Sequence, residues 1–198
     1  MRTVPRKPLN HQVRPREWLT AAEVGRLIQA AQSSSRYPER DALMLLFIYT
    51  HGMRVIEITE LLREHVDFSN RLLHIHRAKR GMFCTHPLNQ QELNALTRLK
   101  QSYEQRGLVA PWVFLTERGG RGEGQFSPRT VHTVVHRAGK ETGFPWPVHP
   151  QMLIASCARN MVKRGIETSS IQQFLGYAQP ASGARYIDLK EKVPDKLG

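Results

Sequence analysis

The chain has 198 residues, which is enough for one ample domain or two small ones. Its 29 lysines and arginines outnumber 17 acidic residues and give a formal charge of +12. This balance favours a polyanionic partner over an acidic one, with an ordinary basic soluble protein as the alternative. A hydrophobic content of 40% excludes a disordered tail, and no apolar run is long enough to cross a membrane.

The cysteines and the N-terminus do not point to export. Cys84 and Cys157 lack the spacing of a disulfide framework or of a metal site, so we expect reduced thiols. Residues 1–16 carry five basic side chains, three prolines and no acid, and they lack the apolar run of a signal peptide. We therefore expect a cytoplasmic protein with an extended basic arm over 1–16, which either lies along a phosphate backbone or is a solvated tail.

Helices are predicted directly after this arm. The capping box Thr20–Glu23 opens a helix that continues to about residue 32. A strongly apolar helix begins at Asp41 and ends at Gly52. A short helix over 54–62 follows.

A β-rich stretch comes next. Three short strands are predicted, over 65–68, 72–76 and 83–88. Polar residues at 69–71 and at 79–81 form the two turns, so the first two strands make a hairpin. A helix over 89–106 follows, because Leu93, Leu96 and Leu99 are spaced to share one face.

The last third is predicted to be helical, after a short apolar run at 112–114 and a glycine-rich loop at 119–124. Ser127 suits an N-cap and Pro128 the first position of a helix that reaches about residue 139. Later helices are predicted over 150–163, over 169–175 and in a short piece that holds Tyr186. The order predicts an α+β domain, mainly α, with one small central antiparallel sheet.

Tyr186 closes a series of motifs. It lies nine residues after Tyr177, in Leu175-Gly176-Tyr177, and 132 after Arg54, in His51-Gly52-Met53-Arg54. This order and spacing resemble the tyrosine recombinases, or phage integrases, and among them the small fimbrial phase-switch DNA invertases. The resemblance covers about residues 19–187. It implies the catalytic domain of that family over 17–187, a short tail over 188–198 and no separate N-terminal core-binding domain.

The resemblance also implies a chemistry that needs neither metal nor nucleotide. A tyrosine attacks the scissile phosphate and forms a 3′-phosphotyrosyl link, which leaves a free 5′-hydroxyl. Tyr186 takes the place of this nucleophile, and Arg54, supported by Glu57, that of an arginine that clamps the phosphate. Lys79 takes the place of the hairpin lysine that protonates the leaving oxygen. Tyr177 stands at a late histidine or tryptophan position, where its hydroxyl can donate to a phosphate oxygen.

One segment, residues 148–155, departs from the family pattern. Gln151 stands where the family has its catalytic histidine, and Ile154 where it has its second arginine. Glutamine forms hydrogen bonds but is no base, and isoleucine carries no charge. Arg159 lies about 140° round the helix from Ile154 and is poorly placed to substitute. We therefore expect impaired catalysis.

Three hypotheses follow. The first is a site-specific recombinase that inverts or integrates DNA. The second is an inactive DNA-binding regulator, or the silent subunit of a mixed recombinase tetramer. The third is a basic structural protein associated with nucleic acid. The expected partner is double-stranded DNA, contacted by Arg80, Arg129 and His132 and bound by a tetramer, alone or with other recombinase subunits.

No membrane, nucleotide, cofactor or metal partner is expected. His132 and His136 have the spacing of a zinc-binding helix, but Thr133 replaces its glutamate and no third ligand follows.

Overall fold

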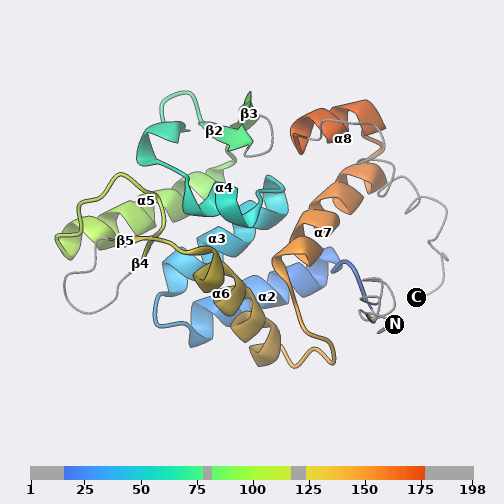
Figure 1. Cartoon of the computed structure of the whole chain (residues 1–198), viewed down its shortest axis with the longest axis horizontal. Coiled ribbons are helices and arrows are strands. Elements are labelled where there is room, and N and C mark those ends of the chain that lie inside the picture. Colours follow the sequence, from blue (N-terminus) through green and yellow to red (C-terminus); the bar gives the residue numbers. More distant parts are fainter. Residues whose placement is uncertain (1–15, 78–81, 117–123, 177–198) are drawn as a thin grey trace, which may run out of the picture.

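The structure is a computed structural model that describes residues 16–77, 82–116 and 124–176 (Figure 1). Its helices are α2 (Ala21–Ser34), α3 (Pro38–Thr50), α4 (Val55–Thr59), α5 (Gln90–Gln105), α6 (Pro128–Glu141), α7 (Pro150–Lys163) and α8 (Thr168–Phe174). Its strands are β1 (Val66–Asp67), β2 (Leu72–Arg77), β3 (Met82–Pro87), β4 (Leu115–Thr116) and β5 (Gly124–Gln125). A 3₁₀ turn, η1 (Arg63–His65), lies between α4 and β1.

Helix α3 lies at the centre of the fold, and α2, α5 and α7 pack against it (Figure 1). Its side chains Leu43, Leu45 and Phe47 are at most 2% exposed, as expected for a helix that is apolar on all sides. A second, smaller apolar cluster joins α7 to α8 through Cys157 and Leu175. Helix α7 therefore contributes to both clusters and holds α8 close to the end of α3.

Strands β1, β2 and β3 form one antiparallel sheet in that order, and β4 and β5 form a separate pair. In β2 the residues 73, 75 and 77 are buried, because alternate side chains of a strand point to the same face. Leu73 and Ile75 are apolar, but the third buried position is Arg77. A fully buried arginine requires hydrogen-bonding partners, and these lie at the candidate site.

The predicted fold class is confirmed, since the described residues form a mainly helical domain with a small antiparallel sheet. Side chains of Thr20 and Ser127 cap the starts of α2 and α6, as predicted. Asn89 caps α5 in the same way, which the sequence analysis did not predict. Helix α7 spans the predicted residues 150–163. The predicted start of α3 at Asp41 is wrong: α3 begins at Pro38, whose fixed φ suits the first position of a helix.

Two further boundaries differ. Helix α4 ends at Thr59 instead of near residue 62, because the next residues pair with the segment before β4. The backbone N–H of Val113 donates to the carbonyl of Leu61 at 2.9 Å, and that of Arg63 donates to the carbonyl of Pro111 at 2.7 Å. Strand β1 is shorter than predicted, since His65 belongs to η1. The short β4–β5 pair has no counterpart among the predicted strands.

Several predicted segments lie outside the described residues. They are the turn at 79–81, nearly all of the loop at 119–124, all but the last residue of the arm at 1–16, and the piece that holds Tyr186. Among the described helices, none is both long and apolar enough to span a membrane.

Candidate active site

A buried carboxylate, Glu57 in the first turn of α4, joins two arginines. The Oε1 atom of Glu57 accepts from Nη1 of Arg54 at 2.6 Å, and its Oε2 atom accepts from Nη1 of Arg77 at 2.8 Å. Oε2 also accepts from the backbone N–H of Arg54 at 2.8 Å. Because Glu57 is 3% exposed, these charge-assisted hydrogen bonds stabilise a carboxylate that would otherwise be costly to bury.

Both arginines also bind the C-terminal end of α8. Arg77 donates from Nη2 to the carbonyl of Phe174 at 2.6 Å, and Arg54 donates from Nη2 to the carbonyl of Leu175 at 3.2 Å. The last carbonyls of a helix lack partners within the helix and carry its partial negative charge. The two guanidinium groups supply hydrogen-bond donors for these carbonyls and positive charge that balances the helix end. The network therefore holds the end of α8 against α4 and β2.

The end of α3 is tied to the same arginine. Arg77 donates from Nη2 to the carbonyl of His51 at 3.1 Å and from Nη1 to that of Gly52 at 3.4 Å. Gly52 has a positive φ of 60°, and a Cβ there would collide with the side chain of Leu175. The close approach of the α3 end to the α8 end therefore requires glycine at this position.

Two histidines extend the network into the core. The His86 ring stacks on Phe174 with 3.8 Å between ring centroids, and its Nδ1 lies 3.3 Å from Nδ1 of His51. Burial lowers the pKa of His86 to about 3, and the charges of His51 and Arg77 add to this effect. His86 is therefore neutral near pH 7.

On its other side, His51 faces an acid. Its Nε2 atom lies 3.2 Å from Oε1 of Glu92, at the start of α5. Burial raises the pKa of Glu92, but the hydrogen bond and charge of His51, with hydrogen bonds from Thr50 and Asn89, outweigh that effect, so the pKa is lowered overall. Glu92 is therefore a buried carboxylate beside the His51 ring.

The two arginines differ in access to solvent. The Arg54 side chain is 18% exposed, whereas that of Arg77 is fully buried. Arg54 can therefore meet an anion from solvent while it keeps its bond to Glu57. Arg77 positions the backbone around it.

Helix α7 places the two residues that depart from the family pattern in different surroundings. Gln151 is exposed, whereas Ile154, one turn later, is 4% exposed and belongs to the main apolar core. Arg159 stacks over Trp18 with its Cζ 3.8 Å from the ring centroid, so its side chain packs against the segment before α2. Arg16 lies over the same ring at 5.0 Å and forms an ion pair with Glu23.

A shallow groove of about 500 Å³ follows the polar face of α6. It contains Arg129 and His132, the two described residues that the sequence predicts to face DNA, and both are exposed. Val131 and Val135 on the opposite face of α6 are buried. The other groove residues are Thr133, His136, Arg137, Lys140, Glu141, Val148 and His149, so basic and imidazole groups predominate.

Four predicted site residues, Tyr186, Tyr177, Lys79 and Arg80, lie outside the described residues. Of the rest, Arg54 reaches the carbonyl of residue 175, two positions before Tyr177. Arg77 is a further site residue that the sequence pattern does not reveal, because the predicted strand ends at residue 76 and a basic residue beside a turn is usually solvated. Across the described ranges, no group of three or more metal-binding side chains occurs.

Comparison with known proteins identifies relatives that agree with the resemblance seen in the sequence. Residues 17–192 match the phage integrase family. The type 1 fimbriae regulatory protein FimB of Escherichia coli (strain K12) is 31% identical over 165 residues, which are 82% of this chain and 79% of that protein. The type 1 fimbriae regulatory protein FimE of the same strain is 30% identical over 179 residues, which are 86% of this chain and 85% of that protein.

Solved structures show the same fold. A crystal structure of the XerA recombinase has a TM-score of 0.72 at 21% identity and covers 90% of this chain and 66% of that one. A lambda integrase tetramer bound to a Holliday junction has a TM-score of 0.68 at 22% identity, over 100% of this chain and 54% of that one. At these identities the likeness concerns the fold alone.

Proposed function

Because the chain belongs to the phage integrase family, we propose that it is a site-specific DNA-binding recombinase of the inversion or integration class whose strand cleavage is impaired. The observation that carries this proposal is the paired network of Arg54, Glu57 and Arg77 at the end of α8. The network leaves the Arg54 guanidinium partly exposed beside the carbonyl of Leu175, two residues before Tyr177 in the sequence. Such a group matches the charge of a phosphate oxygen.

In the proposed reaction, the phenol of Tyr186 gives its proton to water and its oxygen attacks the scissile phosphorus. The bond to the 5′-oxygen breaks, Lys79 gives that oxygen a proton, and a 3′-phosphotyrosyl link remains. Arg54 stabilises negative charge on a nonbridging oxygen of the transition state, and the hydroxyl of Tyr177 donates to the same phosphate. Attack by the free 5′-hydroxyl of another strand reverses the step and exchanges strands.

The proposed impairment lies in the protein groups that bind the phosphate, and not in the nucleophile Tyr186. Removal of one donor to a developing charge costs on the order of 10²–10³ in rate. Ile154 offers no donor, and Gln151 offers an amide where a base is needed. Slow cleavage is therefore the expected activity of the unmodified protein.

A second function, an inactive DNA-binding regulator or silent subunit, is favoured by the burial of Ile154. With 4% exposure among apolar neighbours, this position is integrated in the core. A subunit of this kind would bind DNA beside active recombinase subunits in a tetramer. It would contribute contacts through Arg80, Arg129 and His132 but no cleavage.

A suicide substrate distinguishes the slow recombinase from the silent subunit. It is a duplex with a nick beside the scissile phosphate, and it traps the covalent adduct. Target duplexes are first selected by binding from a random library. A small yield of adduct that Tyr186→Phe abolishes supports the slow recombinase, and bound DNA without adduct supports the silent subunit. Rapid cleavage contradicts the impairment. Binding without sequence preference would indicate a structural nucleic-acid protein instead.

A further inference from the structure

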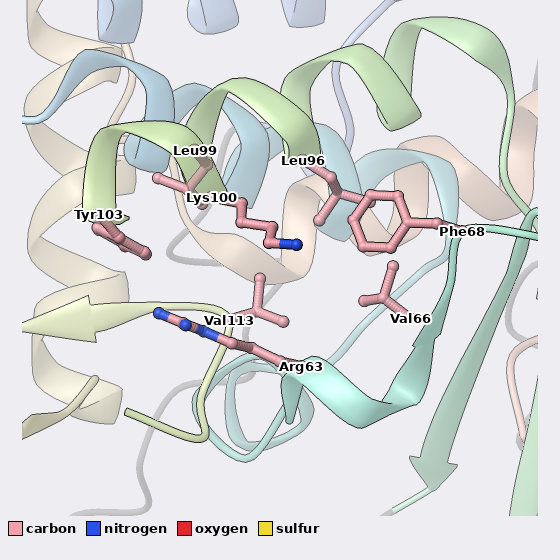
Figure 2. A pocket seen from close by; sticks show the side chains of 8 residues that line it. All are labelled: Arg63, Val66, Phe68, Leu96, Leu99, Lys100, Tyr103 and Val113. Atoms are coloured by element: carbon pink, nitrogen blue, oxygen red, sulfur yellow. The ribbon is translucent and has the colours of Figure 1, made fainter. Parts of the chain in front are cut away.

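A pocket of about 310 Å³ lies outside the candidate active site, between α5 and the η1–β1 segment (Figure 2). This volume is near the lower end of the range for small-molecule sites, about 300–1,000 Å³. Its walls are mostly apolar. They consist of Val66, Phe68, Leu96, Leu99, Tyr103 and Val113, together with the two cations Arg63 and Lys100.

The guanidinium of Arg63 is incompletely paired. Its Nε donates to the carbonyl of Trp112 at 3.3 Å, and its Cζ lies 5.7 Å from the centroid of the Tyr103 ring. Its Nη2 atom is buried, and no hydrogen-bond partner for it is found in the described part of the chain. A buried charged donor without an acceptor is costly, and a ligand oxygen that reaches Nη2 would relieve that cost.

Lys100 supplies a second positive charge. In Figure 2 its ammonium points between Phe68 and Val113 into the pocket. Its Nζ lies 3.8 Å from Oε1 of Glu104, but both side chains are 58% exposed, and such a pair is weak in water. No acidic residue lines the pocket. Lys100 therefore remains available to an incoming anion.

The walls determine what kind of anion fits. Phe68 is 43% exposed, whereas the other wall residues Leu96 and Leu99 are buried. An apolar ligand body in the pocket would therefore cover exposed apolar surface of Phe68. A phosphate or sulfate would carry further oxygens toward apolar walls that offer them no donors. A carboxylate needs few donors and pairs well with a guanidinium fork.

We propose that this pocket binds a small organic acid, a carboxylate on an aromatic or branched apolar body. Arg63 and Lys100 bind the carboxylate, and the apolar walls bind the body. The proposal rests on the pocket alone and does not depend on the proposed recombinase activity.

The test uses 3-phenylpropanoate as the probe and the neutral 3-phenylpropanamide as its matched analogue. Calorimetry should give a Kd of about 1 mM or tighter for the acid. The amide should bind roughly tenfold more weakly, because it lacks the charge-assisted hydrogen bonds. NMR shifts on titration should occur at the methyl groups of Val66, Leu96 and Val113.

Two variants and a control assign the carboxylate. Arg63→Gln and Lys100→Gln should each weaken binding of the acid roughly tenfold and leave the amide unaffected. Arg98→Gln, an exposed change on α5 that lines a different pocket, should change neither. Equal binding of acid and amide would overturn the proposal. So would shifts elsewhere in the protein, or no binding at about ten times the expected Kd.

Discussion

Gly176 lies directly against the buried side chain of Arg77. A Cβ atom at position 176 would stand 2.6 Å from Cγ and 2.8 Å from Cδ of Arg77, and φ of Gly176 is +63°. The close approach arises because Arg77 extends to the carbonyl of Phe174, two residues earlier. The end of α8 can therefore bind Arg77 in this way only while residue 176 lacks a side chain.

Gly176→Ala should destabilise the protein more than an ordinary change at a glycine with positive φ. Left-handed backbone costs an L-residue about 1–2 kcal/mol, and displacement of Arg77 adds to this. Gly165→Ala is the matched control, because φ of Gly165 is +76° and an added Cβ meets nothing within 4 Å. Urea unfolding measures both. Equal losses would show that Arg77 moves aside at little cost.

Arg77→Met should reduce the free energy of unfolding by about 3–5 kcal/mol, because it leaves the buried Glu57 with one fewer cation. Arg54→Met should cost less, since the Arg54 side chain is 18% exposed and water replaces part of its role. Adding Glu57→Leu to Arg77→Met should restore part of the loss, which a double-mutant cycle measures. No restoration would mean that the carbonyl bonds of Arg77, and not its ion pair, dominate.

Stability should fall as the pH is lowered from about 6.5 toward 3. Burial, with the charges of His51 and Arg77, lowers the pKa of His86 to about 3. The unfolded chain therefore takes up a proton below about pH 6.5, which the folded chain resists. The loss is up to about 1.4 kcal/mol per pH unit.

Urea unfolding between pH 4 and pH 7 measures this pH dependence, because that range covers most of the interval over which stability should fall. His86→Phe keeps the ring stack on Phe174 and removes the titrating group, so its stability should depend less on pH. Thr133→Phe, the same new side chain at an exposed position of α6 that does not titrate, should leave the pH dependence unchanged. The same slope in wild type and His86→Phe would contradict the assignment to His86.

The sequence predicts what depends on local pattern. The capping residues Thr20 and Ser127, the helix 150–163 and the family resemblance are all confirmed. It does not predict features that tertiary contacts determine. Helix α4 ends early because residues 61–63 pair with 111–113, and Arg77 acquires its role only when the α8 end lies beside it. A charged residue in a β-strand next to a turn is indistinguishable by pattern from a solvated one.

Arg129→Ala should weaken binding to duplex DNA and reduce the slope of log K against log[salt] by about 0.9, the value for one phosphate contact. The reason is its exposure on the polar face of α6, in a groove with several other basic residues. Arg98→Ala, an exposed change of the same type on α5, is the control and should have a smaller effect. Unchanged affinity and slope for Arg129→Ala would remove α6 from the proposed DNA interface.

The combined change Gln151→His and Ile154→Arg should raise the yield of covalent adduct on a suicide substrate, because it supplies an imidazole and a second guanidinium for the phosphate. The increase should be partial. Ile154 is 4% exposed within the apolar core, so an arginine there must extend out of the core or remain buried without a partner. An uncompensated buried charge costs about 3–5 kcal/mol, and the double variant should therefore also be less stable.

Gln151→His alone separates the two effects, because residue 151 is exposed and its change should leave stability nearly unaltered. If the missing charge at 154 limits cleavage, Gln151→His alone gives little more adduct than wild type, and the double variant gives clearly more. Tyr186→Phe in the double variant should abolish the adduct, which identifies the nucleophile. Equal adduct from Gln151→His and from the double variant would show that a group other than residue 154, such as Tyr177 or a residue from another subunit, completes the phosphate clamp.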